Sequence, residues 1–145
     1  MSTRSGSPAP VAVVSGIASD AHTWNLLYLQ LLLEEYGFRV TNLGACVPTS
    51  ALVAACLRDR PRLVVIGTVN GHGLIEAPAC IRSIRECPAL RGVTVVIGGK
   101  LSLDGECRAR DRQRLLRLGF DRVFTGDDAV SAFERFLAQS ARVAG

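Results

Sequence analysis

An aspartate and a histidine stand two positions apart in the segment SDAHTWN, residues 19–25, directly after an apolar run. A neutral imidazole is a good metal ligand when its other ring nitrogen donates a hydrogen bond to a carboxylate, which orients the ring and makes it more basic. The Asp-x-His spacing permits that contact within a loop. Asp20 and His22 therefore predict a metal ligand, His22, and a carboxylate that positions it. Trp24 either stacks on a bound ligand or anchors the following helix, and we expect it to anchor the helix by packing.

No second metal ligand accompanies this pair in the sequence. His72 is the only other histidine, and we expect it at the rim of the molecule. The five cysteines are dispersed and form no C-x-x-C pair, so a tetrahedral zinc site would lack ligands. A single protein ligand suits a metal whose other positions are filled by a macrocycle. The odd number of cysteines favours reduced thiols and a cytoplasmic location.

Glycine-rich loops follow the third and fourth apolar runs, but they carry no nucleotide-binding motif. The only G-x-G, at Gly71 and Gly73, follows the third run instead of the first, and Glu76 stands where the motif requires its last glycine. The sequence also lacks a P-loop motif. A phosphate-accepting receiver domain needs an aspartate at the end of the third strand, where this chain has Gly67 and Thr68. These three classes of site are therefore not expected.

Five apolar runs alternate with five segments of helical pattern. The expected strands are residues 11–16, 38–44, 62–68, 92–99 and 121–126, and the expected helices are about 23–36, 48–58, 75–87, 108–118 and 127–139. This alternation predicts an α/β protein with a flavodoxin-like (Rossmann-like) fold, a doubly wound five-stranded parallel sheet of order 2-1-3-4-5. Ligands of such sheets bind beyond the carboxyl ends of the strands, where the strand order reverses. The loops after strands one, three and four are therefore expected to meet at one edge.

The length and composition fit a single folded domain. A chain of 145 residues can bury a stable core, and 48% hydrophobic residues with only 6% aromatic residues favour aliphatic packing. The net charge of +4 comes mainly from arginines interleaved with acids, so nucleic-acid binding is not expected. No apolar run is long enough to cross a membrane. We expect a disordered tail at 1–9, the domain at 10–140 and a C-terminal tail at 141–145.

The three loops carry residues that resemble the signature of the cobalamin-binding small subunit of glutamate mutase (methylaspartate mutase). The related cobalamin-binding domains of other mutases and of methionine synthase share this signature, which is D-x-H-x-x-G, then S-x-L, then G-G. The counterparts here are residues 20–25 (DAHTWN), 67–69 (GTV) and 98–99 (GG). The intervals between them, 41 and 28 residues, are similar to those of the family. The resemblance covers about residues 11–138.

The resemblance implies adenosylcobalamin as the cofactor. His22 would replace the cofactor's own base as the lower axial ligand of the corrin cobalt, and Asp20 would orient the imidazole. The implied cofactor-binding residues are Ser19, Asp20, Ala21, His22, Thr23, Gly67, Thr68, Val69, Gly98, Gly99, Lys100, Leu101 and Ser102.

The resemblance also implies a partner and a reaction. In the family the substrate lies in a separate, larger barrel-type subunit that caps the upper face of the corrin. This chain is therefore expected to be the cofactor subunit of an isomerase, a carbon-skeleton mutase acting on glutamate or a related amino acid. It carries no catalytic residues on its own and is expected to be inactive alone.

The chain departs from the signature at three positions, where Asn25, Gly67 and Val69 replace glycine, serine and leucine. In the family the glycine lets the nucleotide tail of the cofactor pass close to the backbone, and the serine hydroxyl contacts the tail's base. The Thr68 hydroxyl is one substitute for that serine. Three alternatives follow: cobalamin with looser tail contacts, a corrinoid with a different lower base, or a scaffold without cofactor. The function could then also be that of a corrinoid carrier or sensor, or of a cofactor-free interaction domain.

Overall fold

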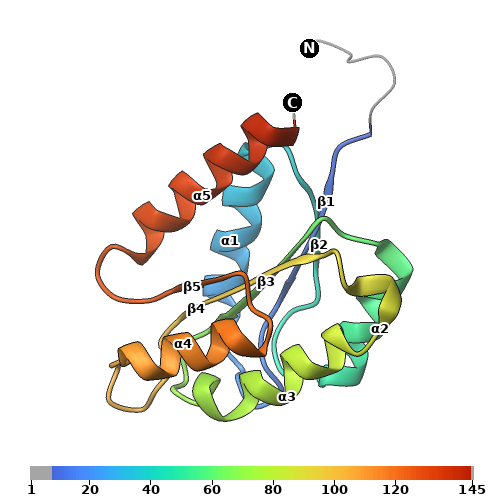
Figure 1. The fold of residues 1–145 in the computed structure, drawn as a ribbon. Coiled ribbons are helices and arrows are strands. Elements are labelled where there is room, and N and C mark those ends of the chain that lie inside the picture. Colours follow the sequence, from blue (N-terminus) through green and yellow to red (C-terminus); the bar gives the residue numbers. More distant parts are fainter. Residues whose placement is uncertain (1–7, 145) are drawn as a thin grey trace.

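The structure is a computed structural model that describes residues 8–144, and it contains a five-stranded parallel sheet with helices on both faces (Figure 1). The strands are β1 (Val11–Ser15), β2 (Arg39–Asn42), β3 (Leu63–Thr68), β4 (Thr94–Gly99) and β5 (Arg122–Phe124). They lie in the order β2-β1-β3-β4-β5, and all four neighbouring pairs are parallel. The predicted fold and strand order are confirmed.

Five helices complete the layers. They are α1 (Trp24–Glu35), α2 (Thr49–Asp59), α3 (Gly73–Arg85), α4 (Ala109–Leu118) and α5 (Ala129–Ala144). In Figure 1, α1 and α5 cover one face of the sheet, and α2, α3 and α4 cover the other. A short 3-10 helix, η1 (Pro88–Leu90), precedes β4. The sheet therefore has two separate cores, one on each face.

The central strand β3 is buried along its whole length. Val64 and Ile66 belong to the core beneath α2, α3 and α4, whereas Leu63 and Val65 belong to the core beneath α1 and α5. Burial of each such aliphatic side chain contributes about 1.5–3 kcal/mol. Apolar side chains on both faces thus hold β3 in place, and its carboxyl end is a rigid support for the residues that follow it.

Several element boundaries differ from the expected ones, and two of the differences have a clear local cause. α3 begins at Gly73, two residues before its expected start, because the His72 carbonyl already accepts the backbone N–H groups of Ile75 and Glu76. α5 continues to Ala144 instead of ending near residue 139, since no glycine or proline interrupts residues 139–144. Of the expected N-terminal tail, residues 1–7 lie outside the described part of the chain.

The loops after β3 and β4 are tied together by backbone hydrogen bonds at the carboxyl edge of the sheet. The amide of Lys100 donates to the Thr68 carbonyl at 2.9 Å, and the amide of Leu74 donates to the Leu101 carbonyl at 2.9 Å. These bonds bring the loop after β4 against the end of β3 and the start of α3. Among the helices described, none has the length and apolar character needed to span a membrane.

Candidate functional site

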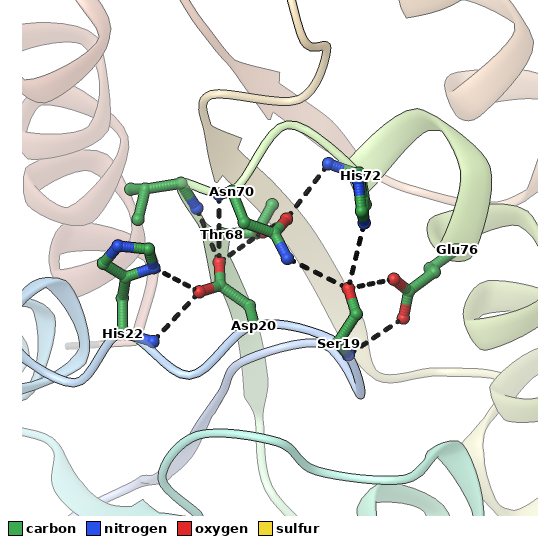
Figure 2. A network of polar contacts seen from close by, with 8 residues as sticks. Ser19, Asp20, His22, Thr68, Asn70, His72 and Glu76 are labelled. Atoms are coloured by element: carbon green, nitrogen blue, oxygen red, sulfur yellow. Dashed lines mark hydrogen bonds and ion pairs between the residues drawn. The ribbon is translucent and has the colours of Figure 1, made fainter.

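Asp20 is the centre of a polar network at the carboxyl edge of the sheet (Figure 2). Its side chain is buried, and its Oδ1 atom accepts hydrogen bonds from the ring Nδ1 of His22 at 2.6 Å and from the His22 amide at 3.0 Å. Its Oδ2 atom accepts from the Thr68 hydroxyl at 2.7 Å, from the Val69 amide at 2.8 Å and from the Asn70 amide at 3.2 Å. One carboxylate therefore joins the loop after β1 to the end of β3.

The hydrogen bonds keep the Asp20 carboxylate ionised despite its burial. Burial alone raises the pKa of a carboxyl group, but the donors from His22, Val69 and Thr68 outweigh it and hold the pKa of Asp20 well below its usual range. An ionised carboxylate can only accept hydrogen bonds. The Nδ1 atom of His22 must therefore carry a proton, and in the neutral imidazole this leaves Nε2 with a free electron pair.

The His22 ring is presented outward from this buried support. Its side chain is 61% exposed, whereas the Asp20 side chain is only 2% exposed. The imidazole thus has one nitrogen anchored to the protein core and the other free to bind a ligand, which is the arrangement typical of metal-ligating histidines. In the described part of the chain, no cluster of three histidine, cysteine, aspartate or glutamate residues offers a larger metal site.

Next to Asp20, Ser19 makes a second set of polar contacts. Figure 2 shows these contacts between Ser19 and the residues at the start of α3. Its hydroxyl donates to the Glu76 carboxylate, accepts from the Asn70 side-chain amide at 2.9 Å and lies 3.4 Å from Nδ1 of His72. The Asn70 side chain also accepts the His72 amide at 3.0 Å. Asn70 and Glu76 were not predicted as site residues. Their only sequence signals are an asparagine in a turn and an acid in the first turn of a helix.

The remaining predicted site residues fall into different environments. Ala21 and Thr23 are exposed next to His22, and the Thr23 carbonyl accepts the first amides of α1. Lys100 is exposed and Leu101 is buried. Ser102 closes its own loop, because its hydroxyl contacts the Asp104 carboxylate at 2.7 Å. The structure brings the first two loops into one network. In the third loop, Leu101 packs into the core and Ser102 bonds within its own loop.

Gly98 and Gly99 end β4, and the backbones of the two neighbouring strands approach them too closely for a larger residue. A Cβ on Gly98 would lie 2.8 Å from the Phe124 carbonyl oxygen, and a Cβ on Gly99 would lie 2.0 Å from the Thr68 carbonyl oxygen. Gly99 also has φ = +109°, a conformation that favours glycine. Packing of the sheet edge is therefore a sufficient reason for both glycines, in addition to the flat surface that they leave.

An apolar pocket of about 180 Å³ opens beside this network, between α1, α5 and the ends of β3 and β4. Its walls are formed by Asn25, Tyr28, Leu29, Val65, Ile66, Gly67, Thr68, Val69, Val96, Ile97, Gly98, Gly99, Phe124, Ala129, Val130 and Phe133. Most of these side chains are aliphatic or aromatic. The pocket is therefore suited to a flat, largely apolar group.

A family model for the B12 binding domain matches residues 10–134. The chain belongs to the B12-binding domain family. It is 33% identical over 126 residues to the glutamate mutase sigma subunit of Halobacterium salinarum, an alignment that spans 83% of this chain and 82% of that subunit. The resemblance inferred from the three loops is confirmed, and the chain is a cobalamin-binding domain homologous to glutamate mutase sigma subunits.

One further relative and one solved structure are similar to this chain. Over 97 residues the chain is 38% identical to the HTH-type transcriptional repressor CarA of Myxococcus xanthus, spanning 64% of this chain and 33% of CarA. A cobalamin-binding protein from Desulfitobacterium hafniense DCB-2 has the same fold with a TM-score of 0.68 at 19% identity, over 93% of this chain and 57% of that one.

One expectation about this B12-binding domain is wrong. Trp24 does not anchor α1 by packing, because its side chain is 81% exposed. The Thr68 hydroxyl, named above as a substitute for the serine of the family signature, donates to the buried Asp20 carboxylate. Trp24 therefore faces solvent, and Thr68 supports Asp20.

The first prediction concerns the stability that Asp20 supplies. An Asp20→Asn substitution removes the charge that three donors from β3 and its loop share, so we expect the free energy of unfolding to fall by about 3 kcal/mol at pH 7. The folded protein lowers the pKa of Asp20. The contribution of the carboxylate to the free energy of unfolding is therefore complete above about pH 4 and is lost as the pH falls from there. Urea unfolding from pH 7 to pH 3 measures both effects.

The control is Glu35→Gln, which makes the same chemical change at an exposed position near the end of α1. We expect this variant to unfold like the wild type within about 0.5 kcal/mol. The difference between wild type and Asp20→Asn should narrow as the solution becomes acidic. A difference that stays constant from pH 7 to pH 3 would contradict the role given to the ionised carboxylate.

Proposed function

We propose that this chain is the cofactor subunit of an adenosylcobalamin-dependent carbon-skeleton mutase of the glutamate mutase type. The contact of 2.6 Å between Asp20 and the Nδ1 atom of His22 carries this proposal. It leaves Nε2 as the free donor atom, and we assign that atom as the lower axial ligand of the corrin cobalt. Adenosylcobalamin bound in this way supplies a carbon radical by homolysis of its cobalt–carbon bond.

The residues of the chain fit such a cofactor at two places. The exposed His22 ring offers a single nitrogen, which suits a cobalt whose equatorial positions the corrin fills. The apolar pocket beside it lies between α1, α5 and the sheet, where the displaced nucleotide tail of a base-off cofactor would enter. Asp20 holds the ring in a fixed orientation because its other oxygen is bonded to the end of β3.

The substrate site is assigned to a separate barrel-type subunit. In this proposal the domain holds the lower face of the corrin, and the partner covers the upper face and carries the residues that act on the substrate. The chain alone therefore has no isomerase activity. All five cysteines are free thiols in the structure, which supports a cytoplasmic location for the complex.

The test of the ligand assignment is electron paramagnetic resonance of the Co(II) form. We enrich the protein in nitrogen-15, bind unlabelled cobalamin and reduce the cobalt. A protein imidazole then splits each cobalt line into a doublet, whereas the cofactor's own base splits it into a triplet. The proposal predicts the doublet in the wild type and its absence in His22→Ala.

His72→Ala is the matched control, because it removes the other histidine of the same sheet edge. We expect this variant to keep the doublet. A triplet in the wild type would mean that the cofactor binds with its own base on cobalt, and the proposal would be wrong. Absence of any corrinoid binding would instead favour the cofactor-free interaction domain.

A second candidate function is that of a corrinoid sensor or carrier, and the similarity to the repressor CarA favours it. The two functions differ in the partner that they need. Affinity purification of the cofactor-loaded chain from its own cells, followed by mass spectrometry, identifies that partner. The mutase proposal predicts a large isomerase subunit, whereas recovery of a methyltransferase or a DNA-binding protein would support the alternative.

A further inference from the structure

Asn25 brings a polar group into the wall of the apolar pocket. It stands in the first turn of α1, where the family signature has glycine, and its side chain lines the pocket. The Asn25 Oδ1 atom is buried and has no hydrogen-bond partner among the described residues. Buried polar atoms are nearly always paired in native proteins, so an unpaired acceptor in a pocket wall indicates a ligand that donates to it.

Asn25 and Gly67 lie next to each other in the wall of this pocket. A Cβ on Gly67 would lie 3.3 Å from the Asn25 Nδ2 atom and 2.8 Å from the Leu29 Cδ1 atom. Side chains of α1 therefore occupy the space that a serine at position 67 would need. The family signature has a serine on the strand and a glycine on the helix, whereas this chain has Gly67 on β3 and Asn25 on α1. The polar side chain is thus on the helix instead of the strand.

Among the side chains that line the pocket, Asn25 is the best placed to distinguish one bound ring from another. Leu29, Val65, Val96 and Phe133 contribute only apolar side chains to the pocket, and its other polar side chains are those of Tyr28 and Thr68. Tyr28 is 49% exposed, whereas the Asn25 Oδ1 atom is buried. The Thr68 hydroxyl donates to Asp20. A flat ring in this pocket is thus bound by apolar contact on its faces, and the Asn25 amide distinguishes rings by the groups on their edges.

We propose that Asn25 selects the lower base of the bound corrinoid, and that it favours a ring whose edge carries an N–H or O–H donor. This inference rests on the proposed function, in which the nucleotide tail enters the pocket. The Asn25 oxygen is already buried in the structure, so a group on the edge of a bound ring is the partner that remains for it. A base with a donor pairs that oxygen, whereas a base without one leaves it unpaired, and sites of this kind discriminate strongly against the analogue that lacks the donor.

The experiment compares matched pairs of corrinoids that differ in one donor. Adeninyl cobamide carries an amino group that purinyl cobamide lacks, and 5-hydroxybenzimidazolyl cobamide carries a hydroxyl in place of the methyl group of 5-methylbenzimidazolyl cobamide. Dissociation constants are measured by absorbance titration of the full chain. The first pair tests an N–H donor and the second an O–H donor.

Asn25→Leu is the main variant, since leucine has a similar size and no amide. Intrinsic coordination strength differs between cobamides, so the measured quantity is the preference for the donor base in the wild type divided by that in the variant. We expect this quotient to be about ten in at least one pair, which corresponds to about 1.4 kcal/mol, the size of one hydrogen bond.

A second variant, Asn25→Gly, restores the glycine of the family signature and keeps the test valid if Asn25→Leu folds poorly. It removes the amide and adds no other hydrogen-bonding side chain. We expect this variant to lose the preference for donor-bearing bases. A preference that survives in it would overturn the role of Asn25.

The outcomes separate this inference from the proposed function. Equal affinities within both pairs in the wild type would overturn the role of Asn25 and leave the cofactor assignment intact. A preference for the bases without a donor would also overturn it. Failure to bind any of the four cobamides would overturn the proposed function and this inference together.

Discussion

The buried carboxylate of Asp20 is the interaction on which the rest of the site depends. It accepts hydrogen bonds from both sides of the sheet edge, from His22 on the loop after β1 and from Thr68 and Val69 at the end of β3. These bonds offset the cost of burying a charge and keep the group ionised. The same charge fixes which nitrogen of His22 is protonated, and so the fold and the ligand chemistry share one residue.

The parallel sheet explains why such a network can form here. β1 and β3 are neighbours although about 50 residues separate them, and their carboxyl ends must lie at the same edge. Next to that edge α1 and α5 diverge enough to leave an apolar pocket. The His22 ring and the pocket thus lie at the same edge of the sheet, which β3 supports with a core on each of its faces.

Much of this arrangement is predictable from the sequence, because it follows from periodicity and topology. The alternation of elements predicts the strand order, and the Asp-x-His spacing predicts the contact between Asp20 and His22. Side-chain directions at the ends of elements are less accessible. Trp24 faces solvent because the helical period turns Leu26 and Leu33 toward the sheet. The partners of Ser19 come from α3 and its preceding turn, and only the tertiary structure brings them together.

The most direct test of the central claim is the tautomer of His22 in the cofactor-free protein, measured by proton–nitrogen correlation NMR of the imidazole ring at pH 8. The account predicts that Nδ1 carries the proton and that Nε2 has the chemical shift of an unprotonated nitrogen, with this preference lost in Asp20→Asn. A proton on Nε2 in the wild type would contradict the account, because the nitrogen assigned to cobalt would then have no free electron pair.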